Sequence, residues 1–206
     1  MHGQPTILAI DPGSLKLGWA VVRGRASRPE RVASGVLRMK ATQSLPERLG
    51  VLLTELTALF DRFAIDELAI EAAFVHDNPH TALVLGQARG LPIALAASRG
   101  LPVHEYPPAL VKRTLVGSGR AEKSQVQNLI ALLLSLPDLP PEDEADALAV
   151  ALTHLRRLEF AAQVPTPAAL AAVAEVPMTP ARALYAAALA DAKNQKSARK
   201  SPGRNR

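Results

Sequence analysis

The chain has 206 residues, of which 48% are hydrophobic and 3% aromatic, so a domain of ordinary size can bury a core made mostly of Leu, Val, Ile and Ala. It contains no cysteine, which excludes disulfides and thiolate metal sites, and neither a signal peptide nor a membrane-spanning run is recognisable, so a cytoplasmic protein with no membrane role is expected. The net charge of +5 comes entirely from residues 160–206, which carry 7 basic and 2 acidic side chains, whereas residues 1–159 carry 17 of each. A basic composition alone therefore says little about what the globular part binds.

The first part of the chain reads as three strands and a helix. Short apolar runs, spaced for an antiparallel meander, predict strands at residues 6–10, 18–22 and 31–38. Apolar residues at helical spacing then predict a helix over 44–63, which Ser44 caps and Glu47 completes as a capping box.

The second part alternates strands and helices. Strands are predicted at 67–71 and 101–106, and helices at 81–98, from 107 to near 117, at 123–135 and at 142–158. The helix over 81–98 contains Gly90 and Pro92, which are expected to interrupt it.

This order of elements predicts an α/β fold with a five-stranded mixed sheet flanked by helices. The fourth and fifth strands each follow a helix, so right-handed crossovers should make them parallel neighbours. We expect a domain over residues 1–159, followed by an Ala-, Pro- and Lys-rich basic tail over 160–206 that is partly helical or disordered.

Four carboxylates stand at the ends of these predicted elements. Asp11 ends the first strand and Glu71 ends the fourth, while Asp143 and Asp146 project from one face at the start of the last helix. If the first and fourth strands are neighbours and the last helix packs across them, the four side chains converge. Such a site of hard oxygen ligands suits Mg²⁺ or Mn²⁺, and two such ions could activate water and stabilise the leaving oxygen of a phosphodiester.

Each of these acids also has an ordinary interpretation. The sequence Asp11-Pro12-Gly13 is a common turn, and Glu71 at a strand end is often simply solvated. Asp143 and Asp146 are favoured at a helix N-terminus because of the helix dipole. Hydrophobic periodicity does not choose between these interpretations.

Six motifs occur in order between residues 7 and 154. They are Ile10-Asp11-Pro12-Gly13-Ser14 with Gly18-Trp19; Ala69-Ile70-Glu71 with Phe74; Ala82-Leu83 with Leu85-Gly86-Gln87-Ala88-Arg89-Gly90; Tyr106-Pro107 with Val111-Lys112; Val116-Gly117-Ser118-Gly119 with Ala121-Glu122-Lys123-Ser124-Gln125-Val126; and Asp143-Glu144-Ala145-Asp146-Ala147-Leu148-Ala149 with Thr153-His154. Together they resemble the RuvC family of Holliday junction resolvases, the crossover junction endodeoxyribonucleases, which are dimeric and have the ribonuclease H-like fold.

The resemblance implies a role for each matching residue. The metal ligands would be Asp11, Glu71, Asp143 and Asp146, with Lys112 and Lys123 as catalytic-site lysines that meet phosphates, Phe74 as an aromatic near the junction centre, and Ser14 and Arg89 as further DNA contacts. His154, two helical turns beyond Asp146, is interpreted as structural or interfacial and not as a ligand of this site.

The resemblance also implies a reaction and partners. The enzyme would be a hydrolase that resolves four-way junctions by paired symmetric nicks through two-metal hydrolysis, leaving 5′-phosphate and 3′-hydroxyl ends, in DNA recombination and repair. Its partners would be junction DNA, a second copy of the chain and the RuvA–RuvB branch-migration complex, and the helix over 81–98 is the candidate subunit interface.

Two other functions fit parts of the sequence. A nuclease of the same fold could act on an RNA–DNA hybrid, and the carboxylates alone do not separate this from junction cleavage, although Phe74 and the segment 112–123 favour the junction. Residues 11–18 also resemble the phosphate loop of actin-like kinases and ATPases, but those need two related lobes, and 206 residues with one such loop are too few.

Overall fold

The computed structural model describes residues 4–72, 78–117 and 122–163. Contacts divide the chain into two compact units, Met1–Gln163 and Val164–Arg206. None of the helices in the described segments has the length and hydropathy that a bilayer span needs.

The first unit contains strands and helices in the predicted order. The strands are β1 (Thr6–Asp11), β2 (Lys16–Arg25), β3 (Arg28–Arg38), β4 (Glu67–Glu71) and β5 (Val103–Tyr106). The helices are α1 (Leu45–Arg62), α2 (Pro79–Ser98), α3 (Pro108–Val116), α4 (Lys123–Leu133) and α5 (Glu142–Gln163).

The five strands form one mixed sheet in the order β3-β2-β1-β4-β5. Strands β1, β2 and β3 are an antiparallel meander, while β4 pairs in parallel with β1 and β5 in parallel with β4. The predicted five-stranded mixed sheet is therefore confirmed, including the parallel pairing of the fourth and fifth strands. Because β4 is inserted beside β1, the carboxyl ends of these two strands meet at one edge of the sheet.

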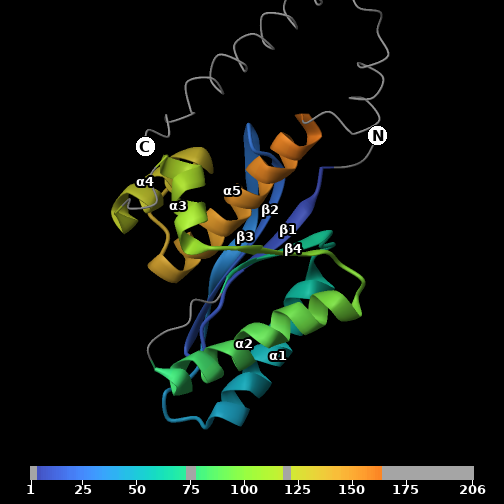
Figure 1. Ribbon diagram of the computed structural model, residues 1–206, viewed down its shortest axis with the longest axis vertical. Coiled ribbons are helices and arrows are strands. Elements are labelled where there is room, and N and C mark those ends of the chain that lie inside the picture. The colour runs from blue at the N-terminus through green and yellow to red at the C-terminus, as the bar shows by residue number, and fades with distance from the viewer. Residues whose placement is uncertain (1–3, 73–77, 118–121, 164–206) are drawn as a thin grey trace, which may run out of the picture. The chain divides into compact units, whose positions relative to one another are not determined.

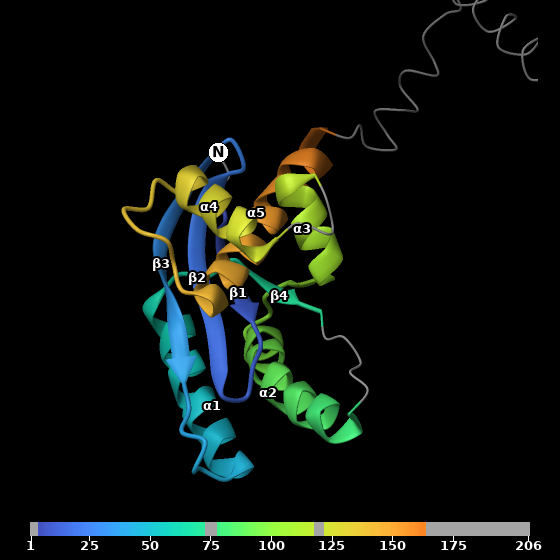
Figure 2. The same ribbon diagram turned by 90° about the vertical axis from the view of Figure 1, so that its left-hand side faces the viewer.

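Helices cover both faces of the sheet (Figures 1 and 2). Alternate residues of β1 face opposite sides, as the pleat requires: Ile7 and Ala9 belong to one buried cluster, and Leu8 and Ile10 to the other. The first cluster contains residues of α3, α4 and α5, and the second contains residues of α1 and α2. The result is a three-layer arrangement with a core on each side of the sheet.

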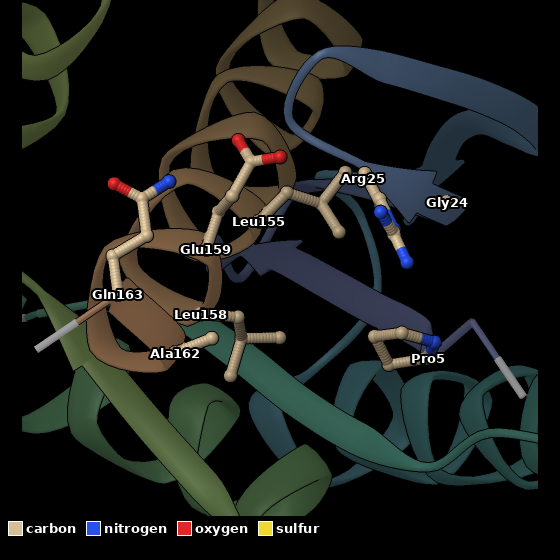
Figure 3. A pocket seen from close by; sticks show the side chains of 8 residues that line it. All are labelled: Pro5, Gly24, Arg25, Leu155, Leu158, Glu159, Ala162 and Gln163. Carbon is tan, nitrogen blue, oxygen red and sulfur yellow. The ribbon is translucent and has the colours of Figure 1, made fainter. Parts of the chain in front are cut away.

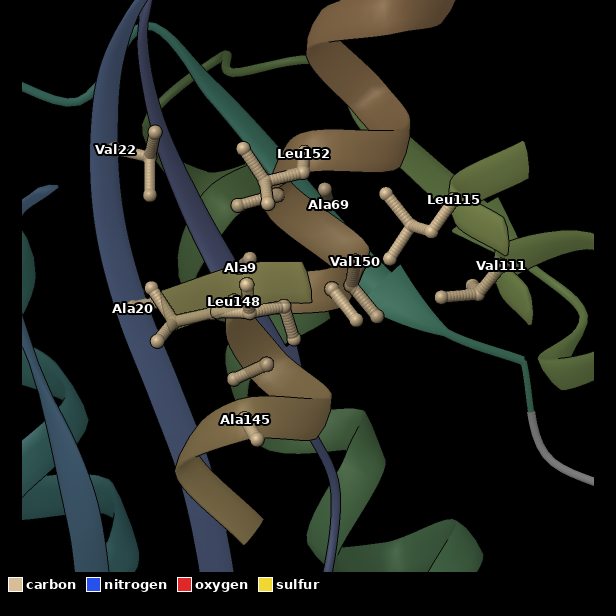
Figure 4. Packing of buried hydrophobic residues seen from close by; sticks show 14 of the residues in the cluster. Ala9, Ala20, Val22, Ala69, Val111, Leu115, Ala145, Leu148, Val150 and Leu152 are labelled. Atoms are coloured by element: carbon tan, nitrogen blue, oxygen red, sulfur yellow. The ribbon is translucent and has the colours of Figure 1, made fainter. Parts of the chain in front are cut away.

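Helix α5 is the most deeply buried helix of the described unit. From Ala145 to Leu155 every residue is buried except Asp146. Figure 4 shows Leu148 and Leu152 of this helix among the small side chains of Ala9 and Ala69 on the sheet. A helix seated so closely on the sheet fixes where its first turn lies.

A glycine in β2 allows that close seating. A Cβ atom built on Gly18 would lie 1.8 Å from the carbonyl oxygen of Asp143, at the start of α5. Since Gly18 is the pairing partner of Asp11 in the sheet, this contact sets the first turn of α5 beside the end of β1.

The structure corrects the prediction for α2. The helix runs unbroken from Pro79 to Ser98, through both Gly90 and Pro92. A proline here removes one hydrogen bond of the helix and crowds its preceding turn. Pro92 is nevertheless buried, as is Ala88 one turn earlier, so apolar packing offsets that loss.

Candidate active site

Asp11 and Glu71 lie side by side at the edge of the sheet. The residues before them, Ile10 and Ile70, are paired in the parallel ladder between β1 and β4. Adjacent parallel strands that end at the same level present their last side chains to the same space. The first and fourth strands are thus neighbours, as convergence of the carboxylates requires.

The first turn of α5 brings the other two carboxylates to this edge. Asp146 lines a cleft together with Glu71, Lys112 and Lys123, and apolar side chains of α3, α4 and α5 form the rest of its wall. Asp143 lies on the β2 side, where the Lys16 ammonium is 3.9 Å from its Oδ2 atom.

Two predicted lysines lie at the cleft. The Lys123 Nζ atom is 4.0 Å from Oδ2 of Asp146 and also contacts the Glu142 carboxylate at the start of α5. Lys112 comes from α3 and lines the same cleft. Cations from two helices therefore stand beside the acids that end β1 and β4.

Burial and mutual repulsion raise the pKa values of the acids. Burial, followed by the charges of Glu71, Asp146 and Asp143, raises the pKa of Asp11 to about 8. Burial and the charge of Asp146 raise the pKa of Glu71 to about 7, against the opposing effect of Lys123 and Lys112. The pKa of Asp146 is also raised, mainly by burial.

Such a group of acids fits a divalent cation. Bringing like charges together in a partly buried place is unfavourable unless a positive charge compensates them, and carboxylate oxygens are the ligands that Mg²⁺ and Mn²⁺ prefer. Among the described residues, the carboxylates of this cleft do not form a trio whose ligand atoms all lie within 4.8 Å of one another. One or two of these carboxylates are enough for an ion such as Mg²⁺, which keeps several waters and takes substrate phosphate oxygens as further ligands.

The remaining predicted residues have other surroundings. The Arg48 guanidinium donates weakly to the Ser14 carbonyl and hydroxyl oxygens, each at 3.4 Å. Arg89 forms an ion pair with Glu105 at 2.5 Å, and its Nε atom donates to the Glu71 carbonyl oxygen at 3.4 Å. Arg89 thus supports the strand end that carries an acid of the cleft. Phe74 lies outside the described residues.

Two neighbours of the site were not singled out from the sequence. Glu142 contacts Lys123, and Lys16 lies beside Asp143. Glu142 stands next to a predicted ligand, so proximity in the sequence could have indicated it. Lys16 gives no such signal, because only the pairing of β2 with β1 and the seating of α5 bring it to the site.

A second hollow lies near the other end of α5 (Figure 3). Its lining includes Leu155, Leu158 and Ala162 of α5 together with Pro5 near the start of β1. Two charged side chains, Arg25 and Glu159, border it, in contrast with the concentration of acids and lysines in the cleft. We therefore take the cleft, and not this hollow, as the candidate catalytic site.

The chain is similar to known proteins of one family. The family model described as crossover junction endodeoxyribonuclease RuvC matches residues 7–154. A crossover junction endodeoxyribonuclease RuvC from Saccharophagus degradans is 48% identical over 72% of this chain and 86% of its own length. The RuvC of Histophilus somni is 46% identical over 77% of this chain and 83% of its own length.

Solved structures give the same result. A Thermus thermophilus RuvC in complex with a Holliday junction substrate superposes with a TM-score of 0.72 and 31% identity, covering 76% of this chain and 96% of that one. The yeast mitochondrial Holliday junction resolvase Ydc2 shares the fold, with a TM-score of 0.57 at 15% identity, covering 76% of this chain and 80% of that one. The chain therefore belongs to the RuvC family, the crossover junction endodeoxyribonucleases, which are hydrolases that resolve Holliday junctions.

Proposed function

We propose that the cleft between the ends of β1 and β4 and the start of α5 cuts the strands of four-way junction DNA by metal-assisted hydrolysis. The observation that carries the proposal is the meeting of Glu71 and Asp146 with two lysines at one cleft, with Asp11 close enough for the charges of these acids to raise its pKa. The Thermus thermophilus RuvC, which superposes on this chain, was solved with a Holliday junction substrate, and this supports the choice of DNA.

The four carboxylates have a common role in this proposal. Asp11, Glu71, Asp143 and Asp146 would hold two Mg²⁺ or Mn²⁺ ions, which when bound lower the pKa of the attacking water and stabilise the leaving 3′ oxygen. Each acid must be ionised to serve as a ligand, so the raised pKa values of Asp11 and Glu71 make ion binding release protons near neutral pH.

The lysines would act on the phosphate itself. Lys112 and Lys123 line the cleft and present ammonium groups to the non-bridging oxygens of the scissile and adjoining phosphates. Cleavage of the bond to the 3′ oxygen leaves a 5′-phosphate and a 3′-hydroxyl. Phe74 follows β4 by three residues, and we expect it to stack on an unpaired base at the junction centre. Ser14 and Arg89 remain candidate DNA contacts.

Paired nicks require two active sites related by symmetry, and we propose a homodimer. Helix α2 is the candidate interface because it exposes apolar surface: Leu83 is 62% exposed, and few residues of the helix are buried in the monomer. We further propose that the enzyme works in the cytoplasm with the RuvA–RuvB branch-migration complex, in recombination and repair.

The test is cleavage of a labelled synthetic four-way junction in Mg²⁺ and in Mn²⁺, beside duplex DNA and an RNA–DNA hybrid of matching sequence. We expect two nicks at symmetric positions in opposite strands of the junction, with ends that a DNA ligase reseals. Little cutting of the duplex or the hybrid is expected. Efficient cutting of the hybrid with an intact junction would instead assign the cleft to the RNA–DNA substrate.

A further inference from the structure

Three side chains on three elements meet away from the cleft. Glu67 begins β4, His104 lies on β5 and His154 lies in the middle of α5. The Glu67 Oε2 atom is 2.8 Å from Nε2 of His104 and 3.0 Å from Nε2 of His154, and the ligand atoms of the three residues all lie within 4.8 Å of one another. We call these three residues the His–Glu cluster.

The His–Glu cluster is separate from the candidate active site. Glu67 precedes Glu71 by four strand residues, which places their Cα atoms about 13 Å apart along β4. His154 follows Asp146 by eight residues, a rise of about 12 Å along α5. Neither imidazole lines the cleft.

One nitrogen of the cluster lacks a hydrogen bond. The Nε2 atom of His104 is shielded from solvent and makes no hydrogen bond, because its 2.8 Å contact with Glu67 does not have hydrogen-bond geometry. The two imidazole rings stand 4.5 Å apart between centroids, and both Nε2 atoms lie within 3.0 Å of the same carboxylate oxygen. A buried polar atom without a partner is unfavourable, and a ligand bound there would satisfy it.

From this geometry we infer that Glu67, His104 and His154 bind one transition-metal ion of the zinc class. Two imidazoles and one carboxylate are a common ligand set for Zn²⁺ with a fourth position left to water. With bonds of about 2.0–2.1 Å, tetrahedral ligand atoms lie about 3.3 Å apart, so the observed spacings of 2.8 and 3.0 Å must open by only a few tenths of an ångström.

The side chains have room for that movement. The His104 side chain is 40% exposed and the Glu67 side chain 20%, whereas His154 is 1% exposed. The buried histidine therefore serves as the fixed ligand, and the two more accessible ones adjust around the ion. The same exposure gives the ion a route from solvent.

Tyr106 positions the fixed ligand. Its hydroxyl lies 2.6 Å from Nδ1 of His154, on the opposite side of the ring from Glu67. Metal-binding histidines usually hydrogen-bond through their second nitrogen, which sets the ring orientation and tautomer. With an ion bound, Nδ1–H of His154 donates to the Tyr106 oxygen, and the lone pair of Nε2 faces the metal.

Burial also keeps these groups in the required protonation states. It lowers the pKa of His154, which favours the neutral imidazole that a metal needs, and it raises the pKa of Tyr106 to about 12. A bound ion would cross-link α5 to both β4 and β5. It would therefore stabilise the position of the helix that carries Asp143 and Asp146.

The test uses the full chain in an Asp11→Asn/Asp146→Asn background, so that ions held by the cleft do not contribute. Metal-stripped protein is titrated with Co²⁺, followed by its visible absorption, and separately with Zn²⁺, followed by thermal unfolding. We expect one Co²⁺ per chain with the intense bands of a tetrahedral site. Saturating Zn²⁺ should raise the Tm by about 5–10 °C.

Two variants and one control assign the ligands. His104→Ala removes an accessible ligand, and Glu67→Gln preserves size while removing the charge; each should weaken Zn²⁺ binding about 100-fold or more. His80→Ala, which removes an exposed histidine of α2, should bind Zn²⁺ as the background does. The Tm of each metal-free variant confirms that it is folded.

The outcomes are distinct from those of the cleavage assay. Unchanged Zn²⁺ affinity in His104→Ala, or no Zn²⁺-dependent rise in Tm in the background protein, would overturn the proposal and leave the cluster as a hydrogen-bonded contact between α5 and the sheet. Neither result bears on whether the cleft cuts junctions.

Discussion

Asp11 lies where burial and three neighbouring carboxylates raise its pKa to about 8, from an ordinary value of 3.8. For an acid whose pKa is higher in the folded state, the folded protein holds its proton more tightly than the unfolded chain. The free energy of unfolding of the metal-free protein therefore falls as pH rises from about 4 to about 8, and stays reduced above that. Glu71, with a pKa of about 7, adds an effect of the same sign.

Replacing this acid should stabilise the protein without its metal. We expect Asp11→Asn to raise the free energy of unfolding by about 2 kcal/mol or more at pH 9. Near pH 4 the difference should be small, because Asp11 is then protonated in the folded protein and about half protonated in the unfolded chain. Thermal unfolding with a chelator at the two pH values measures this. Asp138→Asn, at an exposed position between α4 and α5, is the matched control and should change neither value. A destabilised Asp11→Asn at pH 9 would contradict the electrostatic account.

Asp146 should separate binding from cleavage. Asp146→Asn keeps the size of the side chain but removes the charge that a metal ion requires, so cleavage of a four-way junction should fall by about 1,000-fold or more. Junction binding, measured by gel shift, should remain because the lysines of the cleft are unchanged. Normal cutting by this variant would remove Asp146 from the site.

At the scale of elements, the contact between β2 and α5 determines the geometry of the cleft. Gly18 lies against the backbone of Asp143, so a methyl group there meets a carbonyl oxygen that cannot rotate away. The first turn of α5 would have to move off the sheet, and Asp143 and Asp146 would move with it.

We expect Gly18→Ala to lower the free energy of unfolding by about 2–4 kcal/mol and to reduce junction cleavage, with thermal unfolding and initial rates as the measurements. Gly50→Ala is the control, because nothing lies within 4 Å of a Cβ atom at that position in α1. That variant should be neutral or more stable by up to about 1 kcal/mol. Equal stability of the two variants would show that α5 adjusts freely to the added methyl group.

The elements could be predicted because their signals are local, whereas the residues of the cleft were proposed from the family resemblance. Apolar periodicity, the capping box at Ser44 and Glu47, and strand-ending acids all appear within short stretches of sequence. What local sequence could not supply was the insertion of β4 beside β1, which brings Asp11 next to Glu71. Until that pairing is known, the acids are equally well explained as turn and helix-start residues. Only the resemblance to the RuvC family favoured their interpretation as metal ligands.

The His–Glu cluster could not be predicted from the sequence. Glu67, His104 and His154 are separated by 37 and 50 positions and lie on three different elements, with no short-range ligand spacing between them. His154 was interpreted from the sequence as structural or interfacial, and the structure buries it. Its partners depend on the β4–β5 register, which pairs Leu68 with Val103. The continuity of α2 through Pro92 was likewise not predictable from local sequence, because it depends on apolar packing.

At the scale of the whole molecule, charge is unevenly divided. Residues 1–159 carry no net charge, and the excess of +5 belongs to residues 160–206. Phosphate must therefore be attracted to the cleft by its own lysines and ions, while any long-range attraction for DNA comes from the tail sequence.

Deleting residues 193–206 removes six basic side chains and no acidic ones. We expect weaker non-specific binding to duplex DNA and a salt dependence of log K that is shallower by about 2–5, because fewer counterions are released. Fluorescence anisotropy over a range of salt concentrations measures this. A full-length variant with the same six residues changed to Gln separates charge from length, and identical salt slopes in all three proteins would show that the tail does not contact DNA.

The position of α5 at the end of the first unit determines when all four acids are present during translation. Asp11 and Glu71 are made early, but α5 is the last element of the first unit to be synthesised, and it brings Asp143 and Asp146. A nascent chain that ends before residue 142 contains all five strands but only two of the four acids that we propose as metal ligands. On the proposed ligand assignment, the polypeptide becomes able to cut DNA only after the whole first unit has been synthesised, so unfinished chains would not damage the genome.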